Sequence, residues 1–175
     1  RPDQMPPASM PDGKPWFIWL LNGGRGGGKS KAAAEFCRDQ IEAGKWRHPA
    51  FIGRTAADVR NVIVEDFEGG PKSGIMQVCP PWNKPKYQPA KSRIVWDNPN
   101  FKSYGATAEL YSAEKFEIRG PGHDGCWADE LAAWIYRAAW DNILLTLRMG
   151  TPQIVISTTP RPIALYKEIR KRDGV

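Results

Sequence analysis

The stretch LNGGRGGGKSKAAAEF, Leu21–Phe36, places five glycines and one arginine ahead of a lysine and a serine. Glycine disfavours regular secondary structure, because it adds backbone entropy and has no side chain to pack. The residues from Gly23 to Ser30 match G-x-x-x-x-G-K-[ST], the spacing of a phosphate-binding loop. In such a loop the backbone amides surround phosphate oxygens, a lysine (here Lys29) reaches the terminal phosphates, and a hydroxyl (here Ser30) binds Mg²⁺. A flexible glycine linker is the alternative, which the flanking sequence disfavours.

The flanks have the character that a phosphate loop requires. The six apolar residues 16–21 predict a strand buried on both faces, as in a parallel sheet. Residues 30–43 predict a helix, with Gly44 as its stop. A second short buried strand is predicted at 50–53, and Thr55 is placed to cap a helix over 56–67. This alternation of strands and helices indicates an α/β domain.

The remaining elements are predicted from the same kinds of pattern. Residues 92–106 contain two β-rich runs around Asn-Pro-Asn and predict an antiparallel hairpin at one edge of the sheet. A short apolar run covers 125–130, and a helix with an apolar stripe covers 138–148. Another strand is predicted at 153–158, and a final helix at 161–173.

A second cluster of chemistry is predicted where two of these strands end. Asp129 is placed to hold magnesium together with Ser30, and Glu130 to polarise an attacking water. Acidic residues are also common where a helix starts, so capping is the alternative. Ser157, Thr158 and Thr159 end the strand at 153–158, at the edge where open α/β sheets bind ligands, although an ordinary turn has the same composition.

Composition limits the class of protein. The 175 residues, 41% of them hydrophobic, suit a single domain. The excess of 25 Lys+Arg over 19 Asp+Glu weakly favours a polyanionic partner. Cys37, Cys79 and Cys126 show no disulfide or zinc spacing, which favours a reducing compartment, and His123 with Cys126 is too small a set for a metal. No run is long enough to span a membrane, so we expect a soluble chain.

Together, RPDQMPP, WLLNGGRGGGKSKAAAEF, IGRTAADVRNV, IRGPGHDGCWADELAAW and ISTTPRP resemble the amino-terminal ATPase domain of large terminase subunits, the DNA-packaging motors of tailed phages. The resemblance covers nearly the whole chain. It implies an α/β P-loop NTPase of the additional-strand class, with a mostly parallel central sheet flanked by helices and a β-hairpin excursion. It also implies ATP and Mg²⁺ as ligands. The Walker A residues would be Gly23, Gly24, Arg25, Gly26, Gly27, Gly28, Lys29 and Ser30.

The resemblance also assigns further site residues. Asp129 would be the Walker B aspartate and Glu130 the catalytic glutamate. Ser157 to Thr159 would form the coupling motif that senses the γ-phosphate, and Gln4 would belong to the adenine-recognition segment. The partners implied are double-stranded DNA, a portal protein, a small terminase subunit and further copies of the chain, in a ring on the procapsid in the host cytoplasm.

Arginines are further candidates for the site, because a guanidinium accelerates phosphoryl transfer. Arg25 is expected to act from within the loop on its own nucleotide. Arg119 lies in an expected exposed turn, from which it would reach a neighbouring subunit, although a surface role is nearly as well supported. Arg54 is expected to be solvated.

Residues 1–175 are expected to form only the ATPase core, without the lid subdomain or nuclease domain of the family, and to be mainly monomeric. Two alternatives stay open. In the first, the chain would be a helicase-like ATPase; in the second, it would bind nucleotide with little turnover.

Overall fold

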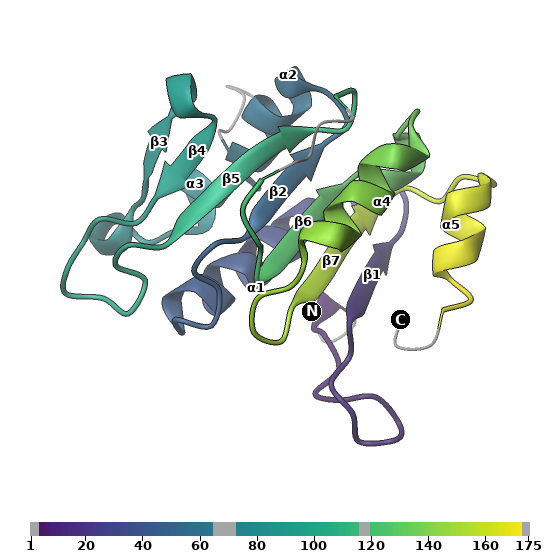
Figure 1. Ribbon diagram of the computed structural model, residues 1–175, viewed down its shortest axis with the longest axis horizontal. Coiled ribbons are helices and arrows are strands. Elements are labelled where there is room, and N and C mark those ends of the chain that lie inside the picture. Colours follow the sequence, from purple (N-terminus) through teal and green to yellow (C-terminus); the bar gives the residue numbers. More distant parts are fainter. Residues whose placement is uncertain (1–3, 65–72, 116–119, 173–175) are drawn as a thin grey trace.

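The computed structural model describes residues 4–64, 73–115 and 120–172, and within them one seven-stranded sheet organises the chain (Figure 1). The order across the sheet is β1-β7-β6-β2-β5-β4-β3. The strands are β1 Ile18–Asn22, β2 Ala50–Gly53, β3 Lys86–Gln88, β4 Arg93–Val95, β5 Thr107–Ser112, β6 Gly125–Asp129 and β7 Gln153–Thr158.

The five strands from β1 to β5 in this order are mutually parallel, and β4 and β3 extend the sheet in antiparallel pairing. The strand β7 lies between β1, which leads into the glycine loop, and β6, which ends at Asp129. This interposed strand is the feature of the additional-strand class. Ser157 pairs with Leu21 on one side and with Asp129 on the other, so all three strands end at the same edge.

Helices cover both faces of the sheet. One face packs against α1 Lys29–Glu42, the π-helix η2 Val59–Val64 and α3 Ile75–Val78, around the aromatic side chains of Trp19, Phe36 and Trp46. The opposite face packs against the short 3₁₀ helix η5 Leu131–Ala133, α4 Arg137–Thr146 and α5 Ala164–Ile169. Figure 1 shows α4 in front of β6 and β7, and α1 behind the sheet.

Most predicted elements are confirmed, and two strands, 50–53 and 153–158, match to the residue. Thr55 caps α2 Ala56–Asp58, since Asp58 N–H donates to Thr55 Oγ1 at 3.0 Å, but the helix continues as the π-helix η2. Its expected end at 65–67 lies outside the described residues. The final helix is shorter than predicted because Pro162 precedes it.

The predicted hairpin exists, but one of its strands is not where the sequence suggested. The run Phe101–Ala106 is a turn, and β4 pairs instead with β5, which begins at Thr107. Trp96 closes this turn, because its amide donates to Ala106 O at 3.0 Å and its carbonyl accepts from Gly105 N–H at 2.7 Å. The hairpin lies at the sheet edge as expected, joined there by two further short 3₁₀ turns, η3 Pro81–Asn83 and η4 Pro89–Lys91.

The start of β6 is held by tight packing. A Cβ atom at Gly125 would overlap the indole ring of Trp46, so this position requires glycine. The carboxylate of Asp124 accepts the amide N–H of His48, at 3.0 Å to Oδ2. The ring of His123 contacts the His48 carbonyl, at 2.9 Å from Nδ1, and the Tyr111 hydroxyl, at 3.2 Å from Nε2. These contacts fix β6 against β2 and thereby position its far end, Asp129.

The three cysteines and His123 are buried in the protein core. Cys37, Cys79 and Cys126 are buried free thiols, and burial raises the pKa of Cys79 to about 12. Within residues 4–64, 73–115 and 120–172, no cluster of three or more His, Cys, Asp or Glu is arranged to hold a metal ion. In the same part of the chain, no helix is long and apolar enough to cross a membrane.

Candidate nucleotide-binding site

The glycine loop joins β1 to α1 and ends in a backbone turn that favours glycine. Gly26 and Gly28 have φ of 75° and 77°, in the left-handed region, and Gly28 is the N-cap of α1. Lys29 Nζ donates to Gly24 O at 2.8 Å, which folds the lysine over the loop. The amides at the start of the 14-residue helix α1 have no helical partners, so this end attracts an anion.

Ser30 and Asp129 meet at the edge of the sheet although 99 positions separate them. Ser30 Oγ donates to Asp129 Oδ1 at 3.2 Å. Ser157 Oγ donates to the same oxygen at 2.6 Å, and is itself held by Trp127 Nε1 at 2.8 Å. Because β7 lies between β1 and β6, its last residues contact the acid strand directly. The end of the glycine loop and the acidic pair Asp129-Glu130 therefore lie next to each other in the structure.

The carboxyl group of Asp129 is buried, with 3% of the residue exposed. The pKa of Asp129 is raised to about 6, chiefly by burial and also by the nearby charge of Glu130, although the hydrogen bonds from Ser157 and Ser30 act to lower it. No basic side chain is among the causes of this shift. The ionised carboxylate is therefore destabilised here unless a cation neutralises it.

Glu130 has a backbone conformation that is uncommon for a residue with a side chain. Its φ is 48° and its ψ 41°, in the left-handed region. Its amide N–H donates to Ser157 O at 2.6 Å, which holds this turn against β7. Its carboxylate accepts two hydrogen bonds from Thr159, at 3.3 Å from the amide and 3.2 Å from the hydroxyl. Strain of this kind is often found at functional sites.

The three hydroxyls of the predicted coupling motif have different surroundings. Ser157 contacts Asp129, and Thr159 contacts Glu130. Thr158 is fully buried, and its Oγ1 accepts the amide N–H of Ala132 at 3.0 Å. The motif therefore joins β7 to both acids and to the turn that follows them.

A cavity of about 370 Å³ lies at this edge of the sheet. It is lined by both predicted acids, by Ser30, by Arg25 and by residues that the sequence reasoning did not assign to the site. Its lining is Arg25, Ser30, Arg54, Asp58, Val62, Asp129, Glu130, Ala133, Thr159 and Arg161. The predicted residues from three separated motifs thus surround one space.

The remaining residues considered in the sequence have different places. Gln4 Nε2 donates to Gly27 O at 2.5 Å, so Gln4 contacts the glycine loop, but it lines a different cavity of about 300 Å³ beside Trp19 and Phe36. Arg54 lines the main cavity, where its Nε is 3.0 Å from Asp58 Oδ2. Arg119 lies outside the described residues.

Sequence reasoning missed Trp127 and Arg161. Trp127 lies two residues before Asp129 on the same strand, and side chains at this spacing share a face, so its contact with the site was inferable. Arg161 follows Thr159 by two positions and belongs to the quoted stretch ISTTPRP, but no role was assigned to it. Its place in the cavity required the tertiary structure.

The parallel sheet, with the glycine loop directly after β1 and the acidic pair Asp129-Glu130 at the end of β6, is that of a P-loop NTPase. A family model described as the amino-terminal part of the terminase large subunit, T4-like-virus type, matches residues 20–174. The chain belongs to this family, and the resemblance seen in the sequence is confirmed.

Solved structures show the same fold. The large terminase ATPase domain of Thermus phage P74-26 has a TM-score of 0.63 and 22% identity, over 86% of this chain and 62% of that chain. The large terminase of a thermophilic bacteriophage, in complex with ATP-gamma-S, has a TM-score of 0.62 and 12% identity, over 81% of this chain and 32% of that chain. This chain therefore spans less than two thirds of either protein. A search of curated proteins finds no match.

Proposed function

We propose that this domain hydrolyses ATP in the presence of Mg²⁺ and that hydrolysis powers translocation of double-stranded DNA into a viral procapsid. The observation that carries the proposal is the 3.2 Å hydrogen bond between Ser30 and Asp129. It joins the end of the phosphate loop to the end of β6, as a nucleotide site with a metal requires. Family membership supports the role in packaging.

The residues at this point fit a magnesium ion. Ser30 and Asp129 offer a hydroxyl and a carboxylate oxygen, the hard oxygen ligands that Mg²⁺ prefers. The pKa of the buried Asp129 carboxyl is raised to about 6, and no basic side chain of the described residues is among the groups that shift it. When bound, Mg²⁺ would neutralise charge on the phosphates of the nucleotide. Ser30 and Asp129 would hold it.

The chain's own residues divide the remaining work. The loop amides and the start of α1 bind phosphate oxygens, and Lys29 adds a positive charge. Glu130, which lines the cavity, orients a water molecule and accepts its proton. Thr159 fixes the carboxylate of Glu130 through two hydrogen bonds. Arg25, within the loop, stabilises charge on the transferring phosphoryl group.

The wider setting follows from the family and belongs to the same proposal. Copies of the chain assemble as a ring on the procapsid, with the portal protein and the small terminase subunit, in the host cytoplasm. Arg119 is the candidate for an arginine supplied to the neighbouring subunit. The isolated domain is mainly monomeric and turns over slowly, because that arginine is then missing from each site.

The test measures both nucleotide binding and phosphate release. Lys29→Ala should abolish hydrolysis and weaken binding of Mg-ATP, whereas Lys31→Ala, which removes an exposed lysine two residues further along α1, should do neither. Glu130→Gln should retain binding and lose turnover, because the amide keeps the shape of the side chain but cannot accept the proton.

Three results would separate the alternatives. Unchanged hydrolysis in Lys29→Ala would reject the phosphate-loop assignment. Binding without hydrolysis in the parental chain, at every protein concentration, would favour a nucleotide-binding fragment. Hydrolysis that responds to single-stranded but not to double-stranded DNA would favour the helicase-like alternative.

A further inference from the structure

Arg161 lies on a short, rigid connection between β7 and α5. Proline occupies both neighbouring positions, and a residue before proline is restricted to extended conformations. The amide of Ile163 donates to the carbonyl of Arg161 at 2.8 Å, which tightens this connection further. The backbone at Arg161 therefore has little conformational freedom, and the position of its Cα and Cβ atoms is fixed.

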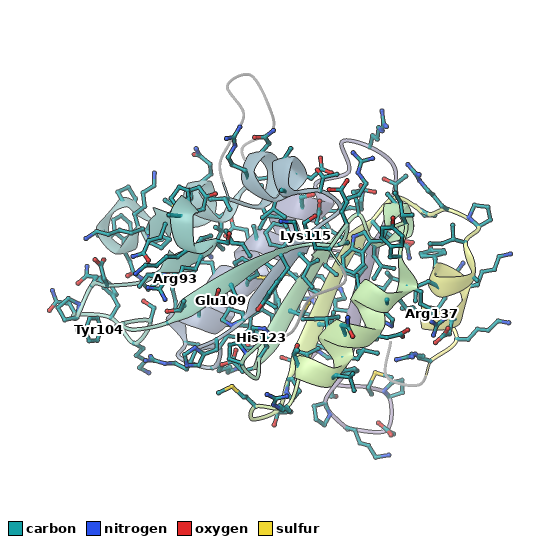
Figure 2. The ribbon with its side chains drawn as sticks, turned by 45° about the horizontal axis from the view of Figure 1, so that its top comes forward. Arg93, Tyr104, Glu109, Lys115, His123 and Arg137 are labelled. Atoms are coloured by element: carbon teal, nitrogen blue, oxygen red, sulfur yellow. The ribbon has the colours of Figure 1, made fainter. Side chains whose placement is uncertain are left out.

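Both ends of the connection are anchored. On the β7 side, Thr159 is bonded to the carboxylate of Glu130. On the α5 side, Tyr166 OH donates to Asn22 Oδ1 at 2.7 Å, next to the phosphate loop. Figure 2 shows Arg137 projecting from α4 toward α5, where its Nη1 lies 2.5 Å from Glu168 Oε2. Arg161 is thus presented to the cavity from a preorganised segment.

Among the residues that the structure describes, some of the charged side chains that line the cavity have partners within the protein, and Arg161 does not. Arg54 is neutralised by Asp58, with which it forms an ion pair. The carboxylate of Asp129 is bonded to two serines, and that of Glu130 to Thr159. Within the described part of the chain, the guanidinium of Arg161 has neither a hydrogen bond nor an ion pair, although it lines the same space.

We propose that the guanidinium of Arg161 binds the terminal phosphate of a nucleoside triphosphate in this cavity, and so lets the site distinguish triphosphate from diphosphate. The planar fork of arginine matches two oxygens of one phosphate. Glu130 and Thr159, which are hydrogen-bonded to each other, line the same cavity as Arg161, and the proposed function assigns the attacking water to Glu130. Arg161 is a separate cation from Arg25, which approaches from the loop.

This inference rests on the proposed function, and the experiment distinguishes the two. Binding of Mg-ATP-gamma-S and of Mg-ADP is measured for the parental chain, Arg161→Ala, Arg161→Lys, Lys29→Ala and Arg148→Ala. Arg148 is an exposed arginine outside the cavity and serves as the matched control. Far-ultraviolet circular dichroism verifies that each variant is folded.

Arg161→Ala should weaken binding of ATP-gamma-S about 10-fold to 100-fold, the loss expected for a charge-assisted hydrogen-bonded pair. Its binding of ADP should change by less than about 3-fold, because ADP lacks the terminal phosphate. Arg161→Lys should recover part of the loss, since it restores the charge without the fork. Arg148→Ala should match the parental chain for both nucleotides.

Two outcomes overturn the inference and leave the proposed function intact. In the first, Lys29→Ala weakens binding but Arg161→Ala leaves both nucleotides unaffected. In the second, Arg161→Ala weakens ATP-gamma-S and ADP equally, so that Arg161 does not contact the terminal phosphate. If the parental chain binds neither nucleotide, or Lys29→Ala binds both as well as the parental chain, the proposed function and this inference both fail.

Discussion

Replacing Asp129 with asparagine should stabilise the nucleotide-free protein at neutral pH. The parental carboxyl is buried and bonded to Ser30 and Ser157, and its pKa is raised to about 6. The asparagine side chain is nearly isosteric, and its amide oxygen can still accept both serine hydroxyls. The substitution therefore removes a buried charge and keeps the hydrogen bonds.

The magnitude follows from the difference between the folded and unfolded pKa. The unfolded value is 3.8 and the folded value about 6. Each unit of pKa corresponds to about 1.4 kcal/mol, so ionising Asp129 costs the folded state about 3 kcal/mol. Below about pH 4 the carboxyl is protonated in both states and there is no cost. As the pH rises from about 4 to about 6, the unfolded chain loses the proton first, and stability falls.

The assay is urea unfolding at pH values from 4 to 8, for the parental chain, Asp129→Asn and Glu114→Gln. Glu114 is an exposed carboxylate and controls for a change of one charge. The gain in the free energy of unfolding of Asp129→Asn over the parental chain should rise from near zero at pH 4 to about 3 kcal/mol at pH 8. Glu114→Gln should follow the parental chain within about 0.5 kcal/mol.

Adding Mg-ATP-gamma-S supplies the second half of the test. The ligand should stabilise the parental chain more than Asp129→Asn, because the variant lacks the carboxylate that would hold the metal. If the parental and Asp129→Asn proteins show parallel stability across the pH range, the reasoning from burial is refuted. Equal stabilisation by the ligand would instead remove Asp129 from the proposed metal site.

Two further predictions concern how the site is positioned. Gly125→Ala should destabilise the protein by about 1–3 kcal/mol, because the added methyl group overlaps Trp46. Gly24→Ala, at a position with open space around the added Cβ, should leave the free energy of unfolding nearly unchanged. Thermal unfolding measures both variants, and equal melting temperatures would show that the contact between β6 and Trp46 tolerates a methyl group. Thr55→Ala should cost about 1 kcal/mol through loss of the cap to Asp58, and Thr55→Ser should restore it; unfolding in urea measures this, and a loss in the serine variant as large as in the alanine variant would contradict the capping role.

The local pattern of the chain predicted most of the fold. Continuous apolar runs identified β2 and β7, since both are buried in a parallel sheet. The hairpin partner was misplaced because Phe101–Ala106 has strand-like composition but closes a turn through Gly105, whose φ is 81°. Composition cannot decide which of two adjacent segments pairs, because pairing depends on the register of the neighbouring strand.

The sequence by itself predicted the phosphate loop, the strand before it and the helix after it, and it singled out Ser30, Asp129 and Glu130, because these depend on residue type and short-range spacing. Only the tertiary structure decided that β7 lies between β1 and β6, which brings Ser157 onto Asp129 and Thr159 onto Glu130. It also decided that Arg161 lines the cavity. Contacts of this kind join positions far apart in the chain, and strand order and burial establish them where local pattern cannot.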